Sequence, residues 1–194
     1  MRILKTALIV LTIIATSLTT VVYGQYTLSE QQSGGISPVH HITEQGRQFI
    51  IDEFGDCQDI VSLIDAIEKY EMAHFSYDYD YAMPLVQSFD FDTFLKAKKG
   101  VCWELAAFAK IVITEISTLN GWRVSNYIID MRPKNNFTKT HSYNYVIADD
   151  IIYTFDLTSA VAHRNPWRRQ FVGNSLEDIY NYAERMNEDV YRVH

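Results

Sequence analysis

Cysteine is scarce in this sequence, with 2 residues among 194. Two cysteines are too few for the disulfide framework that stabilises many small exported domains. Cys57 and Cys102 could form a single disulfide, or Cys102 could be a free thiol with a function. These alternatives exclude each other because a bonded sulfur cannot act as a nucleophile.

Basic residues are outnumbered, with 17 Lys and Arg against 24 Asp and Glu and a net charge of −7. Proteins that bind nucleic acid concentrate positive charge, so this balance argues against a nucleic-acid partner. Arg164, Arg168 and Arg169 do form a local basic patch around Pro166-Trp167. The patch could receive an acidic substrate or a lipid headgroup, although a solvated surface with Trp167 partly packed is the simpler interpretation.

Patterns typical of metal sites are missing as well. Asp90 and Asp92 lack the remaining ligand spacing and the glycine of a calcium-binding loop. His74, His163 and His194 have no partner at a metal-ligand spacing. We therefore expect neither a metal nor a cofactor.

The first residues have the features of a secretory signal peptide. Arg2 and Lys5 precede an apolar run at 7–15, and Val and Gly stand at the −3 and −1 positions of a cleavage site after Gly24. An uncleaved membrane anchor is the alternative, but the segment is short and polar for a spanning helix. Cleavage would remove both basic residues, leaving 15 bases against 24 acids and a net charge of −9.

These features predict three regions: a signal peptide at 1–24, a polar and turn-rich tether at 25–43, and one folded domain at 44–194. We expect a secreted or extracytoplasmic protein, associated with the cell surface if the signal segment is retained. That segment would be its only contact with a membrane.

The stretch from Gly100 to Ala109 opens an amphipathic helix that begins at Cys102. Its apolar residues recur at steps of three and four, the spacing of a buried helical stripe: Leu105, Ala109, Val112, Ile116 and Leu119. Asn120-Gly121 is a typical helix stop. The unpaired N–H groups at a helix start, together with the preceding lysines at 96, 98 and 99, favour a thiolate. A small buried hydrophobe is the alternative for this cysteine.

Periodicity and turn signals outline the other elements. We expect helices at 44–54, 56–74 (with Asp56 as N-cap), 89–97 and from Ser175, an extended stretch at 75–81, and strands at 122–131, 141–148 and 151–158.

The last two strands can be tested for geometry. A hairpin symmetric about Asp149-Asp150 would place His141 and Asp156 on one face as diagonal neighbours, roughly 7 to 8 Å apart at the backbone. Their side chains could then form a hydrogen bond. The inference depends on a two-residue turn, for which Asp-Asp is not a favoured pair.

A cysteine at a helix start, a histidine and an aspartate are the parts of a thiol catalytic triad. Cys102 would be the nucleophile, His141 the base that takes its proton and later protonates the leaving amine, and Asp156 the group that orients the imidazole. The backbone N–H of Cys102 could stabilise an oxyanion. Trp103, Tyr77 and Gln87 are each possible second donors.

Three sequence blocks resemble the motifs of the transglutaminase-like superfamily: Gly100-Val101-Cys102-Trp103-Glu104-Leu105-Ala106, Thr140-His141-Ser142-Tyr143 and Tyr153-Thr154-Phe155-Asp156-Leu157-Thr158. Phe75-Ser76-Tyr77-Asp78 resembles the Tyr-Asp stretch upstream, and separations of 39 and 15 residues within the Cys, His, Asp set suit the family. The sequence departs from the frequent pattern where Ser142-Tyr143 replaces Ala-Trp and Leu157 replaces Pro. The resemblance implies an α+β, papain-like or transglutaminase-like core whose nucleophile helix packs on a small antiparallel sheet.

The resemblance also implies a thiol enzyme with the triad Cys102, His141 and Asp156. A small exported chain is more similar to the hydrolases and proteases of the superfamily than to its calcium-regulated crosslinking enzymes. We therefore expect cleavage of a protein or peptide amide through a thioester. The alternatives are a protein-glutamine acyl transferase that crosslinks or deamidates, and a non-catalytic extracellular binding module. A papain-family protease would normally have Asn at the third position.

Overall fold

The computed structural model describes residues 40–80, 88–135 and 140–194. The predicted signal peptide, the predicted tether up to residue 39 and the candidate donor Gln87 lie outside the described residues. Among the described residues, no helix has both the length and the apolar character required to span a membrane.

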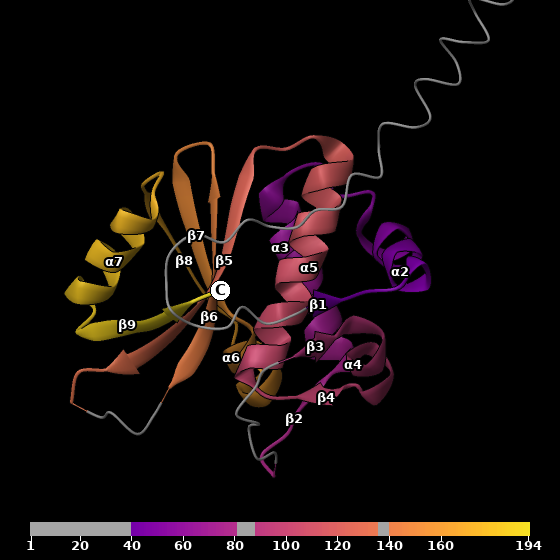
Figure 1. Cartoon of the computed structure of the whole chain (residues 1–194), viewed down its shortest axis with the longest axis horizontal. Coiled ribbons are helices and arrows are strands. Elements are labelled where there is room, and N and C mark those ends of the chain that lie inside the picture. Colours follow the sequence, from indigo (N-terminus) through magenta and orange to yellow (C-terminus); the bar gives the residue numbers. More distant parts are fainter. Residues whose placement is uncertain (1–39, 81–87, 136–139) are drawn as a thin grey trace, which may run out of the picture. The chain divides into compact units, whose positions relative to one another are not determined.

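A five-stranded antiparallel sheet forms the centre of the domain, with the strand order β8-β7-β6-β5-β9 (Figure 1). Its strands are β5 (Val124–Pro133), β6 (His141–Ala148), β7 (Ile151–Asp156), β8 (Trp167–Val172) and β9 (Glu188–Val193). Two short parallel pairs join segments next to the sheet: β1 (His40–His41) with β3 (Phe89–Asp90), and β2 (Ser76–Tyr77) with β4 (Lys99–Gly100).

Helices cover both faces of the sheet, as Figure 1 shows. They are α2 (Glu44–Phe54), α3 (Ile60–His74), α4 (Phe91–Ala97), α5 (Cys102–Asn120), α6 (Leu157–His163) and α7 (Leu176–Arg185). On one face α5 packs with α2, α3 and inward side chains such as Ile128 and Val146. On the other face α7 packs against residues such as Tyr145 and Ile152. The predicted α+β class is therefore confirmed, with the nucleophile helix packed on an antiparallel sheet.

Helix α5 follows the predicted apolar stripe along most of its length. The stripe residues from Leu105 to Ile116 are buried, and Gly121 ends the helix in a left-handed conformation with φ 66°. Leu119 is 55% exposed, so its predicted place in the stripe is wrong.

Two asparagines fix α5 in register with the sheet. The Asn144 side chain donates to the Ala106 carbonyl at 2.8 Å, and the Asn126 side chain donates to the Lys110 carbonyl, also at 2.8 Å. The two acceptors are one helical turn apart. These bonds orient the start of α5 toward the beginning of β6.

The hairpin of β6 and β7 has the predicted register, with Tyr145 opposite Thr154 and Ala148 opposite Ile151. Both turn residues adopt positive φ, 50° at Asp149 and 59° at Asp150. That is the geometry of a type I′ turn, which suits the strand twist and which aspartate tolerates better than most residues. A two-residue turn preserves the parity on which the triad prediction depended.

Three predicted boundaries are wrong because an aspartate caps a helix at a different place. Helix α3 begins after Asp59 rather than Asp56, since Asp59 and Ser62 form a reciprocal capping box. Asp90 caps α4, so that helix starts at Phe91. Asp156 caps α6 and ends β7 two residues early. Prediction missed α6, β8 and β9, whereas Ser175 does cap α7 as expected.

Candidate active site

Cys102 is the first residue of α5 and is 8% exposed. The turn before it is closely packed: a Cβ atom on Gly100 would lie 2.5 Å from the ring of Phe94 and 2.9 Å from Glu104 Oε2. Only glycine fits such an approach. Glu104 Oε2 accepts a hydrogen bond from the Val101 N–H at 3.0 Å, which leaves the N–H of Cys102 directed toward the site.

His141 and Asp156 meet as the hairpin geometry predicts. The distance from His141 Nε2 to Asp156 Oδ2 is 3.0 Å, with the two side chains 31% and 13% exposed. The other oxygen, Asp156 Oδ1, accepts the backbone N–H of Ser159 at 3.2 Å and so caps α6. One carboxylate therefore holds both the imidazole and the start of a helix, and each contact restricts its rotation.

The imidazole also reaches the thiol, because the side chains of Cys102 and His141 are hydrogen bonded to each other. Since Nε2 faces Asp156, Nδ1 is the ring nitrogen available to the sulfur. The structure thus brings together all three residues that the sequence singles out, in the order thiol, imidazole, carboxylate.

Electrostatics favour the charged form of the first pair. Burial raises the pKa of the Cys102 thiol, but the hydrogen bond and charge of His141, with hydrogen bonds from Ser142, bring the net pKa below its ordinary value. Burial lowers the pKa of His141, yet Asp156 and Cys102 together raise it to about 10. The contact between the two side chains therefore shifts both groups toward their charged forms, thiolate and imidazolium. The lysines before the helix were expected to favour the thiolate as well. Lys99 is instead paired with Asp78 at 2.9 Å.

Tyr77 lies against Cys102. It pairs with Gly100 in the short β2–β4 ladder, where the Asp78 N–H donates to the Gly100 carbonyl at 2.8 Å. Its hydroxyl is in hydrogen-bond contact with both the backbone N–H and the side chain of Cys102. Burial, and then the charge of Cys102, raise the pKa of Tyr77, so the phenol keeps its proton.

The other two candidate donors are placed differently. Trp103 is 3% exposed and its ring packs edge-on against Phe89, with 6.0 Å between ring centroids. It is part of the core beneath the site. Gln87 lies outside the described residues. Of the described candidates, Tyr77 is the one whose polar atom reaches Cys102.

Aromatic rings line the side of the imidazole. Tyr143 packs edge-on against His141 at 4.7 Å, and Trp167 stacks on Tyr143 at 5.5 Å. The guanidinium of Arg169 lies over Trp167 at 5.3 Å. No sequence pattern indicated this row, because Trp167 comes from β8, which was not predicted. The row shields one side of the imidazole from water.

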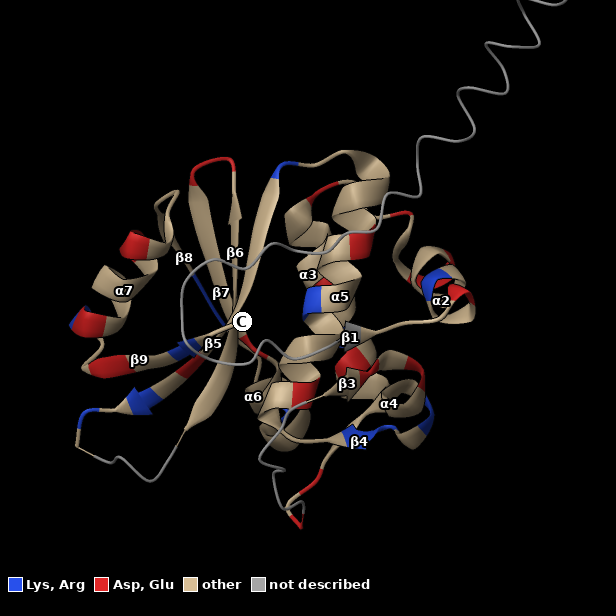
Figure 2. Ribbon diagram, in the orientation of Figure 1, with Lys and Arg blue, Asp and Glu red and all other residues tan. Residues whose placement is uncertain are grey.

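The predicted basic patch is largely used within the protein. Arg168 bridges Asp65 and Glu68 of α3, and Arg164 donates to a backbone carbonyl of the same helix. With Arg169 over Trp167, each of the three arginines has a partner. Figure 2 shows acidic and basic residues interspersed along the described elements. The arginines thus connect β8 and α6 to the rest of the domain.

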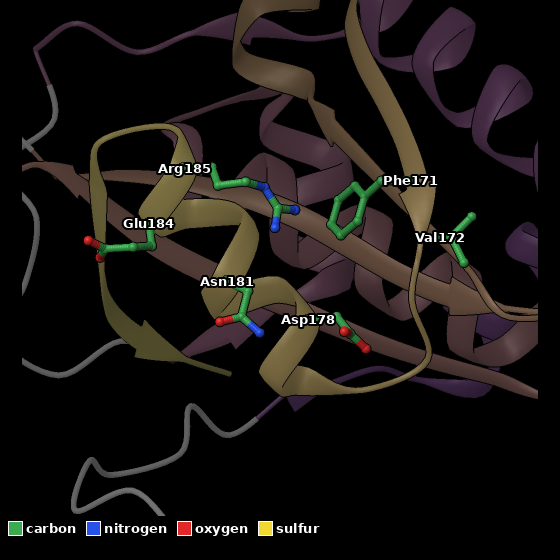
Figure 3. A pocket seen from close by; sticks show the side chains of 6 residues that line it. All are labelled: Phe171, Val172, Asp178, Asn181, Glu184 and Arg185. Atoms are coloured by element: carbon green, nitrogen blue, oxygen red, sulfur yellow. The ribbon is translucent and has the colours of Figure 1, made fainter.

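A pocket of about 360 Å³ lies away from the thiol, between β8 and α7 (Figure 3). It is lined by Phe171, Val172, Asp178, Asn181, Glu184 and Arg185. None of these six belongs to the Cys, His, Asp set, so this pocket is separate from the candidate active site.

The two cysteines are both free thiols in the structure. Cys57 is half-buried in the turn before α3, and burial together with Asp56 and Asp59 raises the pKa of its thiol. Cys102 and Cys57 are therefore opposite in electrostatic environment. Within the described ranges, no group of three or more His, Cys, Asp or Glu side chains is arranged to hold a metal ion.

No protein-family model matches this sequence. No curated protein matches it either. Two solved structures are similar in fold. One is a candidate cysteine protease from Cytophaga hutchinsonii, with a TM-score of 0.46 and 14% identity over 77% of this chain and 49% of that chain. The other is a TGase, with a TM-score of 0.43 and 16% identity over 75% of this chain and 37% of that chain.

The chain therefore spans about half, or less, of the length of those two structures. The similarity is one of fold alone. What the site can do is argued below from its own geometry.

Proposed function

We propose that this protein is an exported, cysteine-dependent hydrolase that cleaves an amide bond in a protein or peptide through a thioester on Cys102. One observation carries the proposal. The Cys102 thiol is hydrogen bonded to His141, whose Nε2 lies 3.0 Å from Asp156 Oδ2. A nucleophile, a base and an orienting carboxylate in contact are the minimum set for acyl transfer at a thiol.

The first half-reaction forms the thioester. The Cys102 thiolate attacks the amide carbon, a C–S bond forms and the carbonyl oxygen becomes an oxyanion. The His141 imidazolium gives its proton to the leaving nitrogen, the C–N bond breaks and an amine departs. Neutral His141 then takes a proton from water, which attacks the thioester. The C–S bond breaks, a carboxylic acid leaves and the thiolate is restored.

The oxyanion would be held by the Cys102 N–H and the Tyr77 hydroxyl. In the resting structure the phenolic oxygen contacts that N–H, so it stands where the substrate oxygen must bind. The incoming oxygen would displace it by a small movement and then accept a hydrogen bond from both groups. Donors placed in this way typically contribute about 10²- to 10³-fold each to the rate.

Hydrolysis and amine transfer share the first half-reaction, so the acyl transferase remains the alternative within the same mechanism. The two are separated by incubating the purified protein with a glutamine-containing peptide, with and without a primary amine, and identifying the products by mass spectrometry. An acid product in both cases supports the hydrolase. An amide adduct formed with the amine supports the transferase.

The direct test of the proposal is the rate of iodoacetamide alkylation at each cysteine as a function of pH. Cys57 serves as an internal reference because the pKa of its thiol is raised. At pH 6.5 we expect Cys102 to be labelled at least about tenfold faster than Cys57, and this advantage to disappear in His141→Ala. Labelling of Cys102 only near the ordinary thiol pKa would contradict the proposal and favour the binding module.

A further inference from the structure

A second polar row, defined here as the Asp130 row, crosses three strands behind the nucleophile. Ser142 on β6 and Asp130 on β5 are directly opposed, and the Ser142 hydroxyl donates to Asp130 Oδ1 at 2.7 Å. His194 follows β9 and places its Nε2 3.1 Å from Asp130 Oδ2. Ser142 is 5% exposed, Asp130 4%, and the His194 side chain 8%. Buried polar groups of this kind have strong, specific hydrogen bonds.

The Asp130 row reaches the sulfur through Ser142. Both the backbone N–H and the hydroxyl of Ser142 lie within hydrogen-bond reach of Cys102. The spacing of the elements explains this contact. Asn144 bonds the Ala106 carbonyl of α5, and a step of two residues back along β6 covers about 6.7 Å. A step of four residues back along α5 covers about 6 Å. The two steps are nearly equal in length, so Ser142 lies beside Cys102.

The Ser142 hydroxyl can donate only one hydrogen bond at a time. A serine hydroxyl has one proton, and here two acceptors compete for it: the Asp130 carboxylate and, once formed, the Cys102 thiolate. His194 donates to the second oxygen of Asp130, so the carboxylate keeps one hydrogen bond if the hydroxyl turns away.

We propose that Ser142 is a catalytic residue whose hydroxyl turns from Asp130 to the sulfur when Cys102 becomes a thiolate, while His194 keeps Asp130 hydrogen bonded. Asp130 and His194 are positioning residues in this arrangement. No covalent bond changes in the turn. The inference rests on the proposed function, in which the thiolate attacks, and it adds a second stabilising contact on the side of the sulfur away from His141.

Other groups also act on the two acceptors. Cys102 faces His141 from β6 and Tyr77 from β2, and its charge also reaches Tyr143. The contacts to Asp130 come from the Asp130 row itself, from β6 and from the residue after β9. A test must therefore change the row and leave His141 and Tyr77 intact.

The experiment measures the pH midpoint of iodoacetamide alkylation at Cys102 in three variants. Ser142→Ala should raise the midpoint and slow labelling at pH 6.5 by about three- to tenfold, because one thiolate donor is lost. Ser142→Thr, which keeps a hydroxyl, should restore most of the rate. Ser117→Ala is the matched control: it removes a buried hydroxyl near the end of α5 that lies away from Cys102, and should leave the midpoint unchanged.

Asp130→Asn should shift the midpoint in the opposite direction. Asparagine keeps the shape but removes the negative charge that competes for the hydroxyl, so the thiolate should form at lower pH. If Ser142→Ala fails to fold, Asp130→Asn still tests the inference, because the asparagine side chain fills the same space as the aspartate. An unchanged midpoint in Ser142→Ala, an equal shift in Ser117→Ala, or a raised midpoint in Asp130→Asn would each overturn the inference. Ordinary thiol behaviour in the wild type would instead overturn the proposed function.

Discussion

Two histidine–aspartate pairs lie on the same sheet. They differ more in solvent exposure than in the distance between the imidazole nitrogen and the carboxylate oxygen. The His141–Asp156 pair spans 3.0 Å, and its side chains are 31% and 13% exposed. The His194–Asp130 pair spans 3.1 Å, and its side chains are 8% and 6% exposed. The first pair contacts the thiol directly through its imidazole. The second contacts it only through Ser142, with the carboxylate in between.

The comparison shows that the geometry of a pair does not assign its role. An imidazole that transfers protons must touch the nucleophile and also be reached by substrate and water, which describes His141. The His194 imidazole is largely buried and does not contact the thiol, so it serves to satisfy the Asp130 carboxylate. The order of the groups separates the two pairs: thiol, imidazole, carboxylate in one, and thiol, hydroxyl, carboxylate, imidazole in the other.

The largest expected effect comes from Asp156→Asn, which breaks the first pair while keeping its cap. Asparagine caps a helix about as well as aspartate, so α6 should stay intact. The amide would donate to His141 and favour the wrong tautomer, lowering the rate of Cys102 acetylation by p-nitrophenyl acetate by roughly 10²- to 10⁴-fold. Asp156→Ala should in addition lower the stability by about 1 kcal/mol through loss of the cap. A thermal midpoint equally low in both variants would argue that the effect is structural.

Tyr77→Phe should have the next largest effect, and only on a reaction that forms an oxyanion. Acetylation by p-nitrophenyl acetate passes through a tetrahedral oxyanion, whereas alkylation by iodoacetamide does not. We expect a loss of roughly 10²-fold in the first rate and little change in the second. The control is Tyr79→Phe, whose ring lies 4.9 Å from that of Tyr77 but whose residue is 72% exposed. Equal losses in both reactions would assign Tyr77 to packing.

His194→Ala breaks the second pair and should act mainly on stability. It leaves Asp130 buried with Ser142 as its remaining partner, which we expect to lower the free energy of unfolding by about 1 to 3 kcal/mol. Urea unfolding measures this change. His141→Ala should cost less, because that imidazole is partly exposed. The reverse ranking would mean that the roles of the two pairs have been exchanged.

The smallest expected effect is the pH dependence of the His141 contribution to stability. Burial lowers the pKa of His141, but Asp156 and Cys102 raise it from 6.5 to about 10. A raised pKa stabilises the folded state fully below pH 6.5, and the contribution is lost as the pH rises through the folded value.

The pKa of Cys102 is lowered and so contributes with the opposite sign, which is why the measurement belongs in Cys102→Ser. There, the thermal midpoint should exceed that of Cys102→Ser/His141→Gln by about 2 to 4 °C below pH 6.5. The difference should decline to zero below pH 10, because Cys102 no longer helps Asp156 to raise the pKa of His141. A difference that grows with pH would show that the imidazole is neutral in the folded state.

Most of the site could be predicted because its parts depend on local rules. The spacing after Cys102 is helical, and a two-residue turn fixes the parity of a hairpin, so His141 and Asp156 had to share a face once Asp149 and Asp150 adopted positive φ. Two-residue turns in hairpins need little information from the rest of the chain.

The rest depends on contacts between distant segments. The first two residues of α6, Leu157 and Thr158, fall within the strand predicted at 151–158, because Asp156 both caps the helix and contacts His141, and a sequence pattern does not reveal that one residue has two roles. Ser142 and Asp130 become neighbours only when β5 pairs with β6, and His194 joins them only when β9 pairs with β5. No periodicity within a single segment carries that information.

The cap at the start of α6 links the candidate triad to a local unfolding equilibrium. Asp156 Oδ1 holds the Ser159 N–H while Oδ2 holds His141, so the seven-residue helix α6 and the imidazole share one rigid group. Short helices fray at free energies below that of global unfolding. When α6 frays, its carboxylate gains rotational freedom and the imidazole loses its support. Warming should therefore lower the reactivity of the Cys102 thiol while the sheet is still folded. Cooling should restore that reactivity without any refolding of the core.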